Sequence, residues 1–347
     1  MTDYSHTNPL VAPDSVDGWL EAVPKPIAIT GGTGFVGSHL VETLCAAGVE
    51  PRVLVRNPGE PRWIGSAPVA WYEGSLGDSD ALEQLVAGVG TVLHLAGVVR
   101  AGRAADFDRG NRDGTANLVA AMAEVAPSAR LVHVSSLAAA GPSPQPEGVG
   151  PEVEPAPISW YGQSKLAAEL EARALGGEGW WTIVRPPAIY GPRDTDVFEF
   201  FRMARRGLIA KPGGERWLSV AWVGDVVRSI VAAVVGDPGR IYHIGEPEPI
   251  LLDKLLADLC RAGGVSARMV TIPPTLVRAV GAVGSGLQRI GWRRLALTGD
   301  KTRELLARHW TAQTEDSMNR LGVRGVTLFA DGAATTWDWY RERGWLS

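Results

Sequence analysis

The chain has 347 residues, of which 45% are hydrophobic, 21% are charged and 42 are glycine. It carries 34 basic and 38 acidic side chains, and a net charge of −4 leaves no cationic field for nucleic acid, so we expect no nucleic-acid partner. The hydrophobic content excludes a disordered chain. The two cysteines exclude a disulfide scaffold or a four-thiolate zinc site, and they fit a cytoplasmic protein.

The N-terminal residues 1–25 are polar and contain prolines without an apolar run, which predicts a flexible tail and no signal peptide. No stretch reaches the roughly 18 uninterrupted apolar residues of a transmembrane helix. The nearest one, 275–290, is glycine-rich and interrupted by Arg278. We expect an amphipathic helix there that packs on a lobe of the protein, with peripheral contact to a membrane surface as the alternative.

Short apolar runs alternate with segments of helical spacing through the first half of the chain. Strands are predicted at residues 27–30, 52–55, 69–72, 91–96, 131–135 and 181–184. Helices are predicted at residues 38–47, 81–86, 115–125 and 164–174. This alternation is typical of a parallel sheet covered by helices on both faces, which is a doubly wound α/β fold of the Rossmann type.

The alternation loosens after Arg185, although a helix near 225–235 and a strand at 240–244 still fit the first pattern. We therefore expect a dinucleotide-binding domain over 26–186, completed by about 216–245. An interleaved, helix-rich substrate lobe should occupy 187–215 and 246–347, and the proline-rich segment 141–157 should be a loop.

A glycine-rich loop follows the first predicted strand and precedes a helix. It reads Gly-x-x-Gly-x-x-Gly at Gly31, Gly34 and Gly37. The first glycine permits a tight turn, the second lets a pyrophosphate approach the backbone, and the third lets the helix pack closely. The helix N-terminus then offers free N–H groups to phosphates. The loop residues expected to bind a dinucleotide are Gly31, Thr33, Gly34, Phe35, Val36 and Gly37.

The end of the second predicted strand bears on the choice between NAD and NADP. An acidic residue there would bind the ribose 2′-hydroxyl, and arginine would favour a 2′-phosphate. The chain has Arg56 at this position, with Arg62 nearby and no acid. We therefore expect NADP(H). In the alternative, Arg56 is solvated or stacks on adenine and the cofactor is NAD(H).

Tyr161 and Lys165 lie four residues apart, and therefore on one face of a helix. A phenol is a poor base at neutral pH, and a neighbouring ammonium lowers its pKa by favouring the phenolate. Tyr161 would then exchange a proton with the substrate while a hydride moves. Ser136, at the end of a predicted strand, would hold the substrate oxygen beside Tyr161.

Several motifs together make the chain similar to the extended short-chain dehydrogenases/reductases of the epimerase/dehydratase superfamily. They are 30–37, His94-Leu95-Ala96-Gly97, Asn111-x-x-Gly114-Thr115-x-Asn117, Ser135-Ser136, Tyr161–Lys165, 185–192 and Val223-Gly224-Asp225. The resemblance implies Ser136, Tyr161 and Lys165 as the catalytic trio, and it implies a homodimer. It also implies that the cofactor contacts Ser75, Leu76, Leu95, Ala96, Gly97, Asn111, Tyr161, Lys165, Pro186 and Ile189.

Departures from the family pattern narrow the expected substrate. Sugar-nucleotide dehydratases carry an Asp-Glu pair where this chain has Leu137-Ala138, and sugar-nucleotide enzymes place Asn where it has Ala188. The pattern is more similar to the 3β-hydroxysteroid dehydrogenase and dihydroflavonol reductase branch, whose substrates are apolar. The tryptophans of the second lobe fit an apolar pocket, or else belong to the core.

The function expected from these residues is hydride transfer between a nicotinamide and a secondary alcohol or ketone. One alternative is a sugar or sugar-nucleotide epimerase with tightly bound NAD, and another is a catalytically silent nucleotide-binding subunit. The histidines do not cluster with acids at metal-ligand spacing, so no metal is expected, and His94 and His133 are predicted to be structural.

Overall fold

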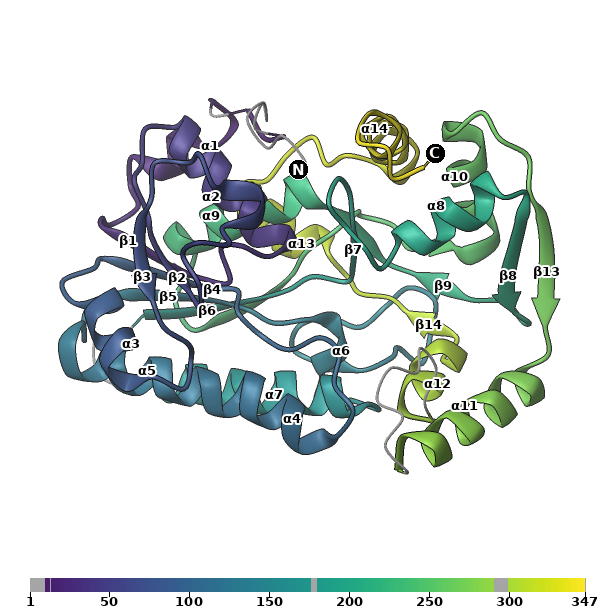
Figure 1. Ribbon diagram of the computed structural model, residues 1–347, viewed down its shortest axis with the longest axis horizontal. Coiled ribbons are helices and arrows are strands. Elements are labelled where there is room, and N and C mark those ends of the chain that lie inside the picture. Colours follow the sequence, from purple (N-terminus) through teal and green to yellow (C-terminus); the bar gives the residue numbers. More distant parts are fainter. Residues whose placement is uncertain (1–9, 13, 176–179, 290–298, 347) are drawn as a thin grey trace.

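The computed structural model describes residues 10–12, 14–175, 180–289 and 299–346 (Figure 1). Its centre is a seven-stranded sheet with the order β11-β6-β5-β4-β1-β2-β3, in which every neighbouring pair is parallel. The strands are β1 (Ile27–Thr30), β2 (Arg52–Val55), β3 (Ala70–Glu73), β4 (Thr91–His94), β5 (Arg130–Val134), β6 (Trp180–Arg185) and β11 (Arg240–His243). The doubly wound Rossmann-type sheet expected from the sequence is confirmed.

Helices cover both faces of this sheet (Figure 1). One face carries α2 (Phe35–Ala46) and α9 (Val223–Val235), and the other carries α3 (Ser79–Val86), α5 (Gly114–Val125) and α7 (Trp160–Arg173). Successive strand residues point to opposite faces, so Ile27 and Ile29 enter the core under α2 whereas Ala28 enters the core under α5. This burial on both faces explains the continuous apolar runs of the strands.

The second lobe is built from short strands and helices around an aromatic core. The strands are β7 (Ala188–Tyr190), β8 (Leu208–Pro212), β9 (Trp217–Leu218), β10 (Val220–Trp222), β12 (Ile250–Leu251), β13 (Arg268–Ile272) and β14 (His309–Trp310). The helices are α8 (Phe198–Arg205), α10 (Leu252–Ala262), α11 (Pro274–Arg289), α12 (Gly299–Leu306) and α14 (Phe329–Glu342). Trp222 and Trp337 are buried here with Tyr190, Phe201 and Tyr340, so these tryptophans belong to the core.

The N-terminal segment differs from the flexible tail expected for residues 1–25. Residues 14–20 form α1 (Asp14–Leu20), and Val16, Leu20 and Val23 are buried in the core under α2 and α9. The apolar residues are too sparse to form a run, but helical spacing brings them onto one face. The tail prediction is therefore wrong for this helix, and residues 1–9 lie outside the described residues.

A segment assigned to the substrate lobe also packs with the sheet. Helix α13 (Glu315–Arg320) and the residues after it contribute Met318, Leu321 and Val323 to the core of α2 and α9. The lobe boundary expected at 246–347 thus fails for this stretch, because the chain returns to the sheet before forming α14. Among the described residues, no helix is long and apolar enough to cross a membrane.

Candidate active site

The loop between β1 and α2 needs glycine for reasons of packing and backbone geometry. Gly31 has φ +77°, and a Cβ there would lie 2.6 Å from the Ala96 nitrogen. At Gly37 a Cβ would collide with the Gly31 carbonyl. Gly34 is different, because its nearest neighbour would be the Gly31 oxygen at 3.2 Å. Close backbone contacts thus require glycine at positions 31 and 37, whereas Gly34 leaves space above the loop.

Helix α2 begins without a capping side chain. Gly34 is its N-cap, no side chain accepts from the first turn, and that turn has no acidic residue. The N–H groups of Phe35 and Val36 therefore have no intrahelical acceptor. An anion bound above Gly34 and Thr33 would receive these donors and the positive end of the helix dipole. The loop fits the pyrophosphate of a dinucleotide.

The residues predicted for the adenosine end follow two neighbouring strands. Arg56 comes directly after β2 and is exposed, and Ser75 is exposed after β3. Leu76 packs against Gly114, and its carbonyl accepts a hydrogen bond from Asn117 at 2.8 Å. Because parallel strands end at the same edge of the sheet, Arg56 and Ser75 lie at the edge where the glycine loop begins.

The segment after β4 is fixed to α7 through Asn111. Its side-chain oxygen accepts from the Val98 nitrogen at 2.6 Å, and its amide donates to the Val98 carbonyl and to the Ser164 hydroxyl at 3.0 and 2.8 Å. A Cβ at Gly97 would lie 2.8 Å from the Asn111 oxygen. Asn111 is thus used by protein partners, and it shapes the Leu95–Gly97 segment that a cofactor would contact.

Helix α7 carries Tyr161 in its first turn. Ser159 is the N-cap and accepts from the Gly162 nitrogen at 3.0 Å, which explains why the helix begins before the predicted residue 164. The Tyr161 ring lies 6.0 Å from the ring of Phe107 on α4 (Ala104–Asp108). Lys165 follows one turn later on the same face, and its ammonium donates to the Val134 carbonyl at 2.8 Å.

Ser136 begins the short helix α6 (Leu137–Ala140), and its hydroxyl accepts from the Ala138 nitrogen at 3.1 Å. A hydrogen bond between the Ser136 hydroxyl and the Tyr161 phenol lowers the pKa of the phenol. The structure therefore brings Ser136 beside Tyr161, and Lys165 one turn behind it on α7.

The electrostatics of the pair differ from the prediction. Burial raises the pKa of Tyr161 to about 12, and this outweighs the Ser136 hydrogen bond. Burial also lowers the pKa of Lys165 to about 8, with Glu169 opposing that shift. The expected lowering of the Tyr161 pKa is wrong for this structure, because burial of the phenol dominates.

Two further predicted contacts lie after β6. The Pro186 carbonyl accepts from the Leu137 nitrogen at 2.8 Å, which joins this segment to the residue after Ser136. Ile189 is partly buried in β7, which pairs with β10. Both residues thus lie on the chain that links the sheet to the second lobe.

A buried ion pair supports α7, and its acidic member, Glu169, was not predicted from the sequence. Glu169 and Arg185 are both fully buried, and the guanidinium donates to the two carboxylate oxygens at 2.7 and 2.6 Å. Ser135 also donates to Glu169 at 2.6 Å. The signal was present, since Glu169 follows Lys165 by four residues and so shares its helix face.

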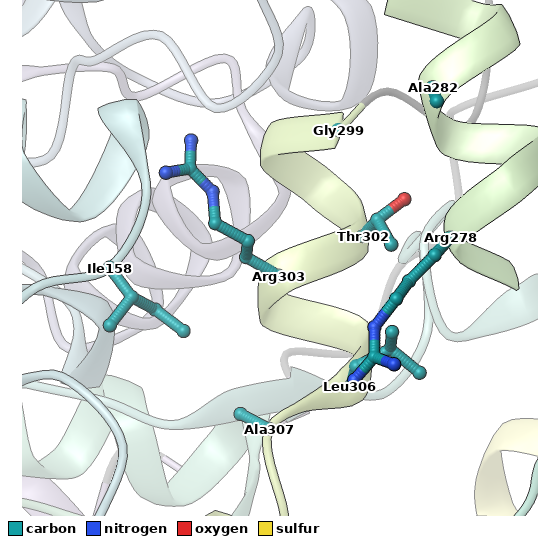
Figure 2. Close-up of a pocket in the computed structure, with 8 residues that line it drawn as sticks. All are labelled: Ile158, Arg278, Ala282, Gly299, Thr302, Arg303, Leu306 and Ala307. Carbon is teal, nitrogen blue, oxygen red and sulfur yellow. The ribbon is translucent and has the colours of Figure 1, made fainter. Parts of the chain in front are cut away.

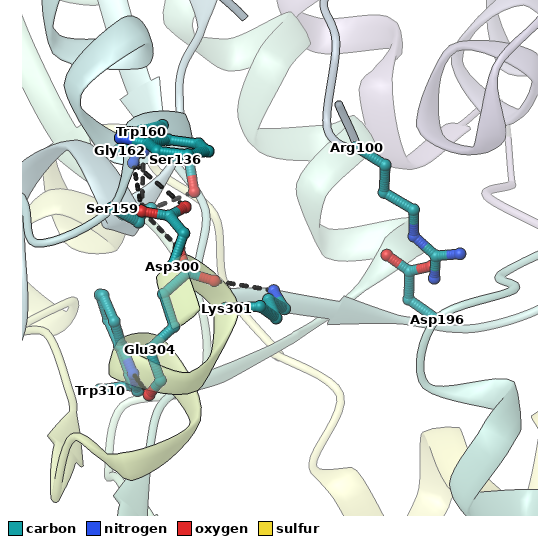
Figure 3. A network of polar contacts seen from close by, with 11 residues as sticks. Arg100, Ser136, Ser159, Trp160, Gly162, Asp196, Asp300, Lys301, Glu304 and Trp310 are labelled. Carbon is teal, nitrogen blue, oxygen red and sulfur yellow. Dashed lines mark hydrogen bonds and ion pairs between the residues drawn. The ribbon is translucent and has the colours of Figure 1, made fainter. Parts of the chain in front are cut away.

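Two carboxylates of α12 bind the beginning of α7, and neither was predicted (Figure 3). Asp300 accepts from the Trp160 nitrogen at 3.1 Å, and Glu304 accepts from the Ser159 hydroxyl at 2.6 Å. Negative charge is favourable at a helix N-terminus. Helix α12 of the second lobe therefore docks directly against the turn that carries Tyr161.

A cavity of 540 Å³ lies between α11, α12 and the residue before the α7 cap (Figure 2). Its lining consists of Ile158, Arg278, Ala282, Gly299, Thr302, Arg303, Leu306 and Ala307. Half of these eight residues are aliphatic and two are arginines, and no tryptophan is among the described residues that line the cavity. Within the described part of the chain, the apolar pocket lined by tryptophan that the sequence suggested is not found at this cavity.

The histidines have structural positions. His94 bridges the Thr30 and Thr115 hydroxyls at 2.6 and 2.9 Å, and His133 is buried beside it with ring centroids 5.1 Å apart. In the described part of the chain, no group of three His, Cys, Asp or Glu side chains is arranged to hold a metal ion.

The comparison with protein families matches residues 27–245 to the model of the "NAD dependent epimerase/dehydratase family". The chain belongs to this family. It is an oxidoreductase, and the resemblance to extended short-chain dehydrogenases/reductases is confirmed.

Curated relatives span almost the whole chain. It is 32% identical to "Ceramide reductase" of Caulobacter vibrioides over 329 residues, which cover 92% of this chain and 96% of that protein. It is 29% identical to "4-hydroxy-2-methyl-3-oxo-4-farnesyl-3,4-dihydroquinoline-1-oxide ketoreductase" of Stigmatella aurantiaca, covering 88% of this chain and 93% of that protein.

Solved structures support the same fold. A double mutant of DesIV, a dTDP-glucose 4,6-dehydratase from Streptomyces venezuelae solved with NAD and DAU bound, matches with a TM-score of 0.74 and 25% identity. The match covers 93% of this chain and all of that chain. A nicotinamide dinucleotide is thus the cofactor of the family and of this structural neighbour.

Proposed function

We propose that this protein reduces a ketone, or oxidises the matching secondary alcohol, on an apolar substrate with a nicotinamide cofactor. The observation that carries the proposal is the hydrogen bond between Ser136 and Tyr161, together with a cavity lined by Ile158, three residues before Tyr161. Two similar proteins are named as reductases, one of ceramide and one of a farnesylated compound. Both names indicate apolar substrates, which supports an apolar substrate here.

The chemistry assigned to the chain is proton transfer and orientation. The bound cofactor supplies or accepts the hydride. Tyr161, with its pKa raised to about 12, is protonated at neutral pH and suited to donate a proton to a carbonyl oxygen. Ser136 would hold that oxygen by hydrogen bonding, and Lys165 would turn from the Val134 carbonyl toward the bound cofactor.

NADP(H) is the proposed cofactor, with NAD(H) as the alternative. The support is Arg56, exposed directly after β2 without an acidic neighbour at the strand end. The remaining contacts assigned to the cofactor are those of the glycine loop, Ser75, Leu76, the Leu95–Gly97 segment, Lys165, Pro186 and Ile189. Thermal unfolding with NADP(H) and NAD(H) tests the choice, because the better ligand raises the melting temperature more.

A dehydratase activity, which the names of some similar proteins state, is less well supported. Residues 137 and 138 are leucine and alanine, and Leu137 is 3% exposed, so no acid follows Ser136 to assist the loss of water. Ala188 likewise offers no amide for a sugar diphosphate.

We also propose that the protein is a homodimer in the cytoplasm. Light scattering after size exclusion tests the dimer.

The decisive experiment compares Tyr161→Phe with the wild type on a panel of lipid and polyketide ketones. We expect kcat to fall by about 10²- to 10⁴-fold, the usual contribution of a general acid. Cofactor-induced thermal stabilisation should be retained, which shows that the variant is folded and loaded. Wild-type turnover by Tyr161→Phe would overturn the assignment.

A further inference from the structure

Helix α11 presents an apolar stripe to the outside of the protein. Leu276, Val280 and Val283 are 53%, 49% and 63% exposed. Their spacing of four and three residues places them on one helix face. Val277, on the adjoining face, is only 5% exposed. The packing on the lobe expected from the sequence thus accounts for the Val277 face, and the α11 stripe (Leu276, Val280 and Val283) is left uncovered by the described residues.

The strand that leads into α11, β13, also exposes apolar side chains. β13 runs into the helix at one end of the molecule and pairs in parallel with β8 (Figure 1). Leu208 lies opposite Arg268 in this pair, and both are exposed together with Val270. Residues at alternate positions share a face of the ribbon, so Arg268 and Val270 point the same way. Apolar and basic side chains are therefore exposed side by side.

The charge of this region is opposite to that of the whole protein. Between Asp258 and Asp300 the sequence has no acidic residue, whereas it has arginine at 261, 268, 278, 289, 293 and 294. The full chain has a net charge of −4, so the positive charge is local. Arg261 forms an ion pair with Asp258, whereas Arg268 and Arg278 make no ion pair with the residues that the structure describes. Local positive charge of this kind complements an anionic surface.

Another face of the same helix borders the cavity. Arg278 and Ala282 contribute to its wall, opposite Thr302 on α12 (Figure 2). Thr302 is 5% exposed, and its hydroxyl has no hydrogen-bond partner in the described part of the chain. One helix thus carries an exposed aliphatic stripe on one face and two residues that line the cavity on another. A lipid bilayer fits this combination better than a protein partner, because it offers apolar chains and anionic head groups together.

We propose that the α11 stripe docks the protein on an anionic membrane surface. Helix α11 would lie in the plane of the interface with Leu276, Val280 and Val283 among the acyl chains, while Arg268 on β13 meets the head groups. The cavity would then lie at the level of the interface. This inference adds a location to the proposed function and does not depend on the identity of the substrate.

The test is co-sedimentation of the full chain with vesicles. One set contains equal parts of phosphatidylcholine and phosphatidylglycerol, and the other contains phosphatidylcholine alone. The variant is Leu276→Ser with Val283→Ser. Its matched control is Val153→Ser with Leu328→Ser, which removes two other aliphatic side chains that are 51% and 53% exposed. Size exclusion of each protein without vesicles is the second readout.

We expect the wild type and the control to bind the anionic vesicles, with weaker binding at high salt and on neutral vesicles. The Leu276/Val283 variant should bind at least about tenfold more weakly, because it loses apolar burial. Failure of the wild type to bind, or equal binding by the variant, would overturn the proposal. A change in the oligomeric state of the variant alone would also overturn it, since the stripe would then join two copies of this chain.

Discussion

Two parts of the molecule contact α7 around Tyr161, the sheet and helix α12, and they are built in different ways. On the sheet side, buried contacts fix the geometry. Gly37 packs closely against the Gly31 backbone, and the Glu169–Arg185 ion pair is fully buried. On the α12 side, the Trp160 nitrogen and the Ser159 hydroxyl donate hydrogen bonds to two partly exposed carboxylates, those of Asp300 and Glu304. From this difference we expect changes on the sheet side to affect the stability of the fold, and changes on the α12 side to affect the proton chemistry of Tyr161.

A stability measurement on Glu169 should give the largest effect. Glu169→Ala leaves the Arg185 guanidinium buried without its carboxylate, and removing one partner of a buried pair costs about 3–5 kcal/mol. Urea unfolding should show this loss in the free energy of unfolding. Glu171→Ala, two residues along α7 and only partly buried, is the control and should change it by less than about 0.5 kcal/mol. Equal values for the two variants would contradict the comparison.

Acid should act on the sheet side through its buried histidines. Burial lowers the pKa of His39 and of His94 to about 3, and that of His243 to about 4. The unfolded chain takes up these protons near pH 6.5 and the folded protein does not, so stability is complete above pH 6.5 and is lost as the pH falls toward 4. Each histidine contributes at most about 1.4 kcal/mol per pH unit.

The variant His39→Gln tests this dependence, because glutamine can still donate to the Pro192 carbonyl that His39 contacts at 2.9 Å. Between pH 4.5 and 6, urea unfolding should give a shallower slope of stability against pH than in the wild type, by about 1 kcal/mol per pH unit. His309→Gln, at a partly buried position of the second lobe, is the matched histidine substitution for comparison. An unchanged slope in His39→Gln would mean that His39 takes up its proton in the folded state.

The sequence predicts the sheet side far better than the α12 side. The strands and the glycine loop are local patterns, so apolar runs and a Gly-x-x-Gly-x-x-Gly spacing are enough to place them. The bond from Ser159 to Glu304 joins residues 145 positions apart, and the chain path between them passes through the second lobe. The direction of the Tyr161 shift was missed for a related reason, since burial comes from distant segments such as Phe107.

The smallest effect is expected on the α12 side, from Glu304→Gln. The amide still accepts from Ser159, so the free energy of unfolding should change by less than about 1 kcal/mol. The negative charge of Glu304, however, raises the pKa of Tyr161. Its removal should lower that pKa, so the alkaline limb of the kcat profile should begin at a lower pH. KM should rise by at most about threefold, because α12 keeps its hydrogen bond.

Glu315→Gln, on α13, provides the control charge removal and should leave the profile in place. A shift of the alkaline limb in Glu304→Gln alone would show that α12 acts on the proton held by Tyr161. A change in stability without a shift would instead place Glu304 among the residues that only hold α12 against α7. The sheet side and the α12 side would then differ only in how strongly they stabilise the fold, because both would act only by fixing the position of α7.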